Sequence, residues 1–247
     1  MNKLGNLAIA QGDLPDAMRH FTDSLSIREN LVVNDPDNVR YQRALSVSLE
    51  KLGDLAETMG DLPAAMRYFA ECHTIRETLA IRTPANTEWQ SDLSISLEKL
   101  GDLAMAEGDL SSALRYLTDS LTIRERLVAN HPGNAKWQRN LYIAHLKLGD
   151  LAVARGDPSA ALRGFTGSIA TAEYLVSSDP GNAAWQRDLW VSYWKVANVF
   201  ENNGNPDEAS NWWLKAHEAL TGMKARNLFV SAQDEEFLEE LRLKLGR

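Results

Sequence analysis

Cysteine is almost absent from this sequence, and that absence excludes several kinds of site. The 247 residues include one cysteine, Cys72, so the chain has neither an internal disulfide nor a cysteine-based zinc site. The five histidines are scattered, and no two stand at the spacing of metal ligands. No local His or Asp signature accompanies the lone thiol. We therefore expect no catalytic residue, no metal and no cofactor.

Long apolar runs and clustered basic residues are also missing. No stretch of 18 or more apolar residues occurs, which predicts no membrane-spanning helix. Lysine and arginine number 26 against 34 aspartates and glutamates, a formal net charge of −8. Nucleic acids and membrane surfaces attract clustered positive charge, so neither is an expected partner. The composition predicts a cytoplasmic protein.

What the sequence does contain is a repeat. The segment at positions 100–104, Leu-Gly-Asp-Leu-Ala, recurs at positions 4–8, 52–56 and 148–152, and a divergent copy begins at position 196. The copies therefore start at positions 4, 52, 100, 148 and 196, with a constant period of 48. A fixed period of this size is typical of a solenoid, in which each unit contacts only its neighbours.

Each repeat is predicted to be two antiparallel helices. Apolar residues recur at steps of three and four on both sides of Gly108, which is the pattern of one helix face. Asn86 is expected to cap the first helix and Asp109 the second, because their side-chain oxygens can accept from free backbone N–H groups. Asn205 and Glu208 are expected to form a capping box for the last pair.

These signals divide the chain into five repeats and a last helix, all in one solenoid domain. The predicted segments are residues 1–36, 37–84, 85–132, 133–180, 181–224 and 225–247. The first helix is truncated, which favours a fragment of a longer protein over a natural start at Met1. It is also expected to leave the end of the second helix, around Leu31 and Val33, partly uncovered.

The last predicted segment, 225–247, is expected to be a C-terminal capping helix. Ser231 is expected to cap it, with Asp234 at the third position. An apolar stripe lies on one side and glutamates lie on the other. Terminal repeats of solenoids need such a polar outer face.

Three unusual residues interrupt the repeat pattern. His73 and His145 replace apolar residues, and each is expected to be a partly buried, hydrogen-bonded histidine. Cys72 replaces a serine found at the same position in other repeats, which predicts a small core residue.

The repeat resembles the tetratricopeptide repeat family. The residues that carry the resemblance are Leu52, Gly53, Ala56, Gly60, Ala65, Phe69 and Cys72. The family unit is shorter, at about 34 residues, so the repeat here is similar to an extended variant common in bacterial proteins. The resemblance implies an all-α, right-handed superhelix of five antiparallel helix pairs plus the C-terminal capping helix.

The resemblance also implies a binding surface. In that family the first helices line a concave groove that binds an extended peptide or a partner helix. Carried over position by position, the groove residues are Glu50, Lys51, Asp54, Glu98, Lys99, Asp102, Leu146, Lys147, Asp150, Trp194, Lys195 and Asn198. Trp190 is added to them as one of the aromatic residues that crowd the last units. The charged residues form either a solvated face of weak salt bridges or a binding surface. The two tryptophans belong either to the core or to a binding hot spot.

The charges indicate what such a groove would bind. Glu50 and Glu98 stand where the family's best-known groove needs lysine to clamp carboxylates, so a protein or peptide with basic residues is favoured. We predict a non-enzymatic protein–protein interaction scaffold. Two alternatives stay open. The chain is either a sensor or spacer arm of a larger multidomain signalling protein, or a scaffold that forms a homo-oligomer through the uncovered N-terminal repeat.

Overall fold

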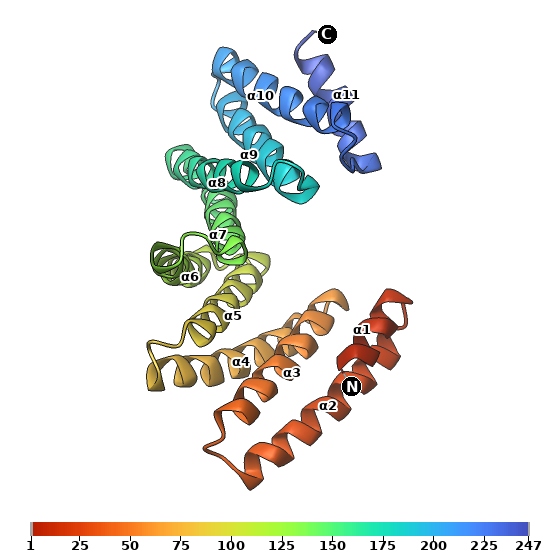
Figure 1. Ribbon diagram of the computed structural model, residues 1–247, viewed down its shortest axis with the longest axis vertical. Coiled ribbons are helices and arrows are strands. Elements are labelled where there is room, and N and C mark those ends of the chain that lie inside the picture. The colour runs from red at the N-terminus through yellow and green to blue at the C-terminus, as the bar shows by residue number, and fades with distance from the viewer. Residues whose placement is uncertain (1, 247) are drawn as a thin grey trace. The chain divides into compact units, whose positions relative to one another are not determined.

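The computed structural model describes residues 2–246, and Met1 and Arg247, which bound the first and last predicted segments, lie outside the described residues. The described residues form eleven α-helices and no strand, which confirms the predicted all-α solenoid of helix pairs. In chain order (Figure 1) the helices are α1 (Asn2–Ala10), α2 (Leu14–Asn34), α3 (Val39–Thr58), α4 (Leu62–Arg82), α5 (Thr87–Ala106), α6 (Leu110–Asn130), α7 (Ala135–Ala154), α8 (Pro158–Ser178), α9 (Ala183–Asn202), α10 (Pro206–Ala225) and α11 (Ala232–Lys244). We call the odd-numbered helices α1 to α9 the front helices and the even-numbered helices α2 to α10 the back helices.

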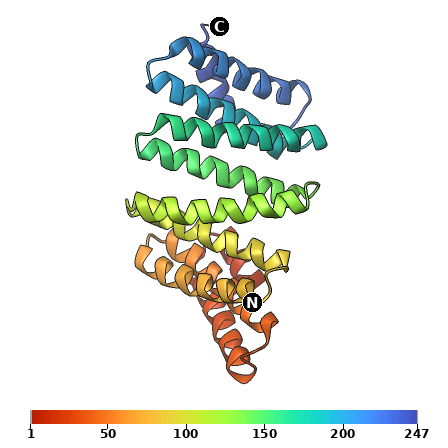
Figure 2. The same cartoon turned by 90° about the vertical axis from the view of Figure 1, so that its left-hand side faces the viewer.

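The chain forms two compact units, unit 1 (Met1–Ile123) and unit 2 (Arg124–Arg247). Helix α6 crosses the boundary between them. Within unit 1, each helix from α1 to α5 packs against the next, and within unit 2 the same holds from α7 to α11 (Figure 2). Helices that are neighbours in the sequence are therefore neighbours in space, as in a solenoid.

The turn from a front helix to a back helix is made by a glycine and an aspartate. Gly60 has a φ of +77°, a left-handed conformation that favours glycine. The Asp61 N–H donates to the Ala56 carbonyl at 2.9 Å, which satisfies the end of α3. Asp61 Oδ1 then accepts from the Ala64 N–H at 3.0 Å and caps the start of α4. One dipeptide thus ends one helix and begins the next.

The predicted helix caps are confirmed with one exception. Asn86 Oδ1 accepts from backbone N–H groups of α5, and Asp109 Oδ1 accepts from the Ser112 N–H at 3.0 Å. The capping box expected at Asn205 is wrong, because the Asn205 side chain makes no cap hydrogen bond. Its amide nitrogen donates to the Asn203 carbonyl at 3.4 Å instead, so α10 starts on Pro206 alone.

The glycine of each Leu-Gly pair allows a front helix and its back helix to approach closely. A Cβ atom added at Gly53 would lie 2.4 Å from Cε1 of Phe69 on α4. The same clash recurs between Gly149 and Phe165 at 2.3 Å. Phe69 and Phe165 are both fully buried, so the aromatic ring fills the space that a side chain on the facing helix would need.

Helix α1 leaves apolar side chains uncovered. Leu4 and Leu7 are 49% and 53% exposed, whereas their counterparts Leu52 and Leu55 on α3 are fully buried. Leu52 and Leu55 belong to the same core cluster as Phe21 of α2, the back helix that precedes them. The predicted exposure at the end of α2 is confirmed, because Leu31 is 37% exposed.

Helix α11 covers the last front and back helices. Ser231 and Asp234 form the predicted capping box. Asp234 is also buried and pairs with Arg187 of α9, with 2.9 Å between Oδ1 and Nε. Leu238 and Leu241 of α11 are fully buried against α9 and α10. The helix therefore packs in unit 2 much as a further front helix would.

Candidate functional site

The front helices of unit 1 carry a lysine–aspartate contact between neighbouring repeats. Lys99 of α5 places Nζ 2.7 Å from Oδ1 of Asp54 on α3, and Lys51 places Nζ 3.1 Å from Oδ2 of the same carboxylate. Lys99 Nζ also lies 5.6 Å from the ring centroid of Phe69. Burial alone would lower the pKa of Lys99, but Asp54 and other nearby carboxylates together outweigh it, so the pKa stands above its usual value.

Unit 2 repeats the same contact. Lys195 of α9 places Nζ 2.6 Å from Oδ1 of Asp150 on α7, and the same Nζ lies 5.5 Å from the centroid of the Phe165 ring. Lys195 and Asp150 occupy the repeat positions that Lys99 and Asp54 occupy in unit 1. The remaining predicted groove residues lie half-buried on α5, α7 and α9: Glu98, Asp102, Leu146, Lys147 and Asn198.

Glu50 takes part in a buried ion pair that the sequence reasoning missed. Its Oε2 lies 2.7 Å from Nη1 of Arg76 on α4, and the side chains are 17% and 3% exposed. Nη1 of Arg76 also donates to the Asp92 carbonyl of α5 at 3.1 Å. Burial alone would lower the pKa of Arg76. Nearby acidic groups, Glu50 among them, keep that pKa above its usual value. Glu50 therefore contributes to the packing contact between α3, α4 and α5 and is not an open groove residue.

Arg76 is one of three arginines at the same repeat position of successive back helices. The three are Arg28, Arg76 and Arg124. Their Nη1 atoms donate to the backbone oxygens of Ala44, Asp92 and Asn140, at 2.7, 3.1 and 2.7 Å. The signal in the sequence was an arginine repeating inside an apolar helix face, where a lone charge is costly unless it is paired.

In the fourth repeat, a tyrosine on another helix makes the hydrogen bond that this arginine makes in the earlier repeats. Ala172 of α8 stands where Arg124 does in α6. Tyr142 of α7, which is buried, donates its hydroxyl to the Asp188 carbonyl at 3.0 Å. Asp188 stands one repeat period after Asn140, so the same backbone oxygen receives a donor. Burial is the main cause that raises the pKa of Tyr142, so the hydroxyl keeps its proton.

The two tryptophans predicted for the groove have different environments. Trp190 is 1% exposed and packs on Phe237 of α11, with ring centroids 5.5 Å apart. This places Trp190 in the core, and we remove it from the predicted binding surface. Trp194 is half-buried, with its ring centroid 5.3 Å from that of Phe237.

The unusual residues of the repeat pattern lie in the packing between helices. Cys72 is buried, as predicted, and that burial raises its pKa to about 12. His73 Nδ1 lies 3.2 Å from the Ser96 hydroxyl, which confirms the partly buried, hydrogen-bonded role. His145 is half-buried too, but among residues 2–246 its ring makes no hydrogen bond, so that part of the expectation is wrong.

The described residues contain neither a cluster of metal ligands nor a membrane-spanning helix. Over residues 2–246, no three His, Cys, Asp or Glu side chains are grouped to hold a metal ion. None of the described helices is long and apolar enough to cross a bilayer.

A family model for the tetratricopeptide repeat matches residues 1–37 and 92–133. The match covers about a third of the chain. This confirms the resemblance seen in the sequence. None of the curated proteins matches the sequence significantly.

Solved structures share the fold of this chain. BtubC (BKLC) from P. vanneervenii has a TM-score of 0.69 and 16% identity, covering 94% of this chain and 82% of its own. The nearly identical repeats of a kinesin light chain-type protein from Podosopora anserina have a TM-score of 0.55 and 16% identity, covering 91% and 94%. Nro1, a hypoxic regulator of sterol synthesis that is a nuclear import adaptor, has a TM-score of 0.51 and 12% identity, covering 97% and 90%. At these identities the likeness shows the fold alone.

Proposed function

We propose that this chain is a non-enzymatic protein-interaction scaffold that binds a peptide or a partner helix along its front helices. The observation that carries the proposal is the repeated lysine–aspartate contact, Lys99 with Asp54 in unit 1 and Lys195 with Asp150 in unit 2. These side chains are between 23% and 38% exposed. They are held in place by their neighbours and are still accessible to a partner.

The energetics of such pairs favour exchange with a partner. A partly exposed ion pair contributes about 0–1 kcal/mol to stability, so a partner that offers its own charge can replace one member at small cost. The Asp54 carboxylate forms ion pairs with both Lys51 and Lys99, and a basic side chain of the partner would join or displace them. The excess of acidic residues over the whole chain also favours a basic partner segment.

A selection experiment tests this proposal. Random peptides displayed on phage would be selected on the full chain, and the enriched peptides would be synthesised for fluorescence anisotropy. The front variant is Lys51→Ala/Asp54→Ala/Lys99→Ala. The matched control is Asp16→Ala/Arg19→Ala, which removes an exposed ion pair from the back helix α2.

We expect peptides with basic residues, and we expect the front variant to weaken their binding by about tenfold, the loss of one or two charge-assisted hydrogen bonds. The control should bind as the wild type does. If every selected peptide binds the front variant unchanged while circular dichroism shows both proteins folded, the front helices are not the binding surface.

A second candidate function is self-assembly, and the exposed side of α1 favours it. Leu4 and Leu7 present apolar surface where the equivalent residues of α3 are buried, and a helix pair of a second copy would cover it. Light scattering of Leu4→Glu/Leu7→Glu beside the wild type tests this candidate. A wild-type monomer at high concentration would end it. The sensor or spacer arm, the cytoplasmic location and the boundaries of the six predicted segments stay predictions.

A further inference from the structure

Two cavities open between the back helices of unit 1. The first, about 260 Å³, lies between α2 and α4 over α3 and is lined by Glu29, Leu45, Leu49, Glu71, Thr74 and Ile75. The second, about 510 Å³, lies between α4 and α6 over α5, and its lining includes Glu77, Leu93, Leu97, Asp119, Thr122 and Ile123. Each residue in the second set stands one repeat period after its counterpart in the first. The two cavities are therefore one site repeated.

The cavities combine an apolar floor with unpaired carboxylates. Leucines of the front helix form the floor, and each of the two back helices contributes one acidic side chain. Within residues 2–246, these four carboxylates make no hydrogen bond and no ion pair; they are Glu29, Glu71, Glu77 and Asp119. Such a lining can accept hydrogen bonds from a ligand that carries donor groups.

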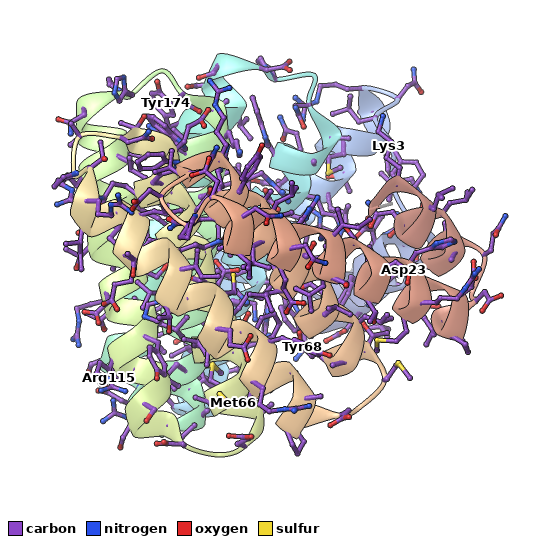
Figure 3. The ribbon with its side chains drawn as sticks, turned by 90° about the horizontal axis from the view of Figure 1, so that it is seen from below. Lys3, Asp23, Met66, Tyr68, Arg115 and Tyr174 are labelled. Atoms are coloured by element: carbon purple, nitrogen blue, oxygen red, sulfur yellow. The ribbon has the colours of Figure 1, made fainter. Side chains whose placement is uncertain are left out.

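His73 adds a further acceptor to the second cavity. The Ser96 hydroxyl already donates to the Leu93 carbonyl at 2.8 Å, so the hydrogen-bond network assigns the proton to His73 Nδ1 and leaves Nε2 as an acceptor. The cation in this lining is Arg115, whose guanidinium carbon lies 4.8 Å from the centroid of the Tyr116 ring. Figure 3 labels Arg115 on α6 together with Met66 and Tyr68 on α4.

Unit 2 contains the same position filled by its own side chains. Between α8 and α10, Tyr193 replaces Leu97, Trp212 replaces Tyr116 and Lys215 replaces Asp119. The Tyr193 hydroxyl donates to Glu173 Oε1 at 2.9 Å, and Glu173 corresponds to Glu77.

The lysine of this filled position lies over its rings. Lys215 Nζ is 3.9 Å from the centroid of the Trp212 ring. We call this position of unit 2 the filled copy. It shows which groups occupy the position when the chain supplies them itself: apolar rings, a hydrogen-bond donor toward the glutamate and a cation.

We infer that the two cavities of unit 1 bind a protein segment whose apolar side chains are accompanied by lysine or arginine. The apolar part would cover the leucine floor, and the cation would supply donors to Glu77 and Asp119 in one cavity and to Glu29 and Glu71 in the other. Because packed helix axes lie 8–10 Å apart and one front helix packs between successive back helices, the two cavities stand at most about 20 Å apart. An extended segment spans that distance in about six residues. This surface differs from the lysine–aspartate contacts of the proposed function, and the inference needs only that the chain is an interaction scaffold.

The filled copy provides the test. The filled variant, Leu97→Tyr/Tyr116→Trp/Asp119→Lys, transfers the side chains of unit 2 into the second cavity. A single variant, Asp119→Lys, changes one exposed residue and keeps the test valid if the triple variant does not fold. Asp23→Lys is the matched control, because Asp23 occupies the same register on α2, one repeat period before Glu71, and lines neither cavity.

The probes are the basic peptides selected on the full chain, measured by fluorescence anisotropy. We expect the filled variant and Asp119→Lys each to weaken binding about tenfold or more, and Asp23→Lys to stay within about twofold. Three results would overturn the inference: equal binding to the filled variant, an equal effect of Asp23→Lys, or displacement of the peptide by free spermidine at similar concentration. Peptides that the front variant loses and the filled variant keeps would support the proposed function and reject this surface.

Discussion

The buried pair of Arg76 and Glu50 leads to a quantitative prediction. The change is Arg76→Met, which keeps most of the apolar volume and removes the guanidinium. It leaves the Glu50 carboxylate, 17% exposed, without its cation, and it takes a donor from the Asp92 carbonyl. Breaking a buried pair from one side costs about 3–5 kcal/mol. Because Glu50 keeps some contact with water, we expect the lower end of that range.

A second variant separates the contribution of the two charges from the contribution of side-chain packing. The double variant Arg76→Met/Glu50→Leu removes both charges, and replacing a buried ion pair by apolar residues is often neutral or stabilising. We therefore expect the double variant to recover most of the stability that Arg76→Met loses. The control is Arg19→Met on α2, whose guanidinium pairs with Asp16 and whose side chain is 67% exposed. Because that pair is exposed to solvent, its loss should be much smaller than the loss from Arg76→Met.

Urea unfolding followed by far-UV circular dichroism measures these differences. Because a solenoid can unfold in parts, amide hydrogen exchange of α3 to α5 should accompany it and locate the loss in unit 1. If Arg76→Met lowers the free energy of unfolding no more than Arg19→Met does, the ion pair does not stabilise the contact between α3, α4 and α5. The same conclusion follows if the double variant is less stable than Arg76→Met alone.

Three further predictions concern other parts of the core. Gly53→Ala should destabilise unit 1 by about 1–3 kcal/mol, because its Cβ would overlap the Phe69 ring; a urea midpoint equal to wild type would contradict the close approach. Cys72, with its pKa raised by burial to about 12, should resist iodoacetamide at pH 8 in the folded chain and react in urea; mass spectrometry distinguishes the two results. Burial lowers the pKa of both His73 and His145 below the usual value of 6.5. The unfolded chain then binds more protons, so stability should fall as pH drops below about 6.5. His73→Gln/His145→Gln should flatten that part of the curve in thermal unfolding, and an unchanged slope would assign it to other groups.

Local chemistry made much of this fold readable from the sequence. The glycine and aspartate of each front-to-back turn and the asparagine caps all depend on residues within one turn of each other, and the repeat period multiplies each of these signals along the chain. The capping box at Ser231 was predictable for the same reason. Asn205 was misjudged because its amide has an alternative acceptor in the Asn203 carbonyl, and sequence spacing does not rank two such partners.

The tertiary structure decided which of the predicted surface residues are open. Glu50 of α3 meets Arg76 of α4, and Trp190 of α9 is covered by Phe237 of α11. Such contacts depend on how helices pack, which a local pattern does not specify. The cavities between the back helices show the same division. Their repeating positions are visible in the sequence, but only packing reveals that unit 1 leaves them open while Tyr193 and Trp212 fill the equivalent place in unit 2, because the volume left over depends on every side chain around it.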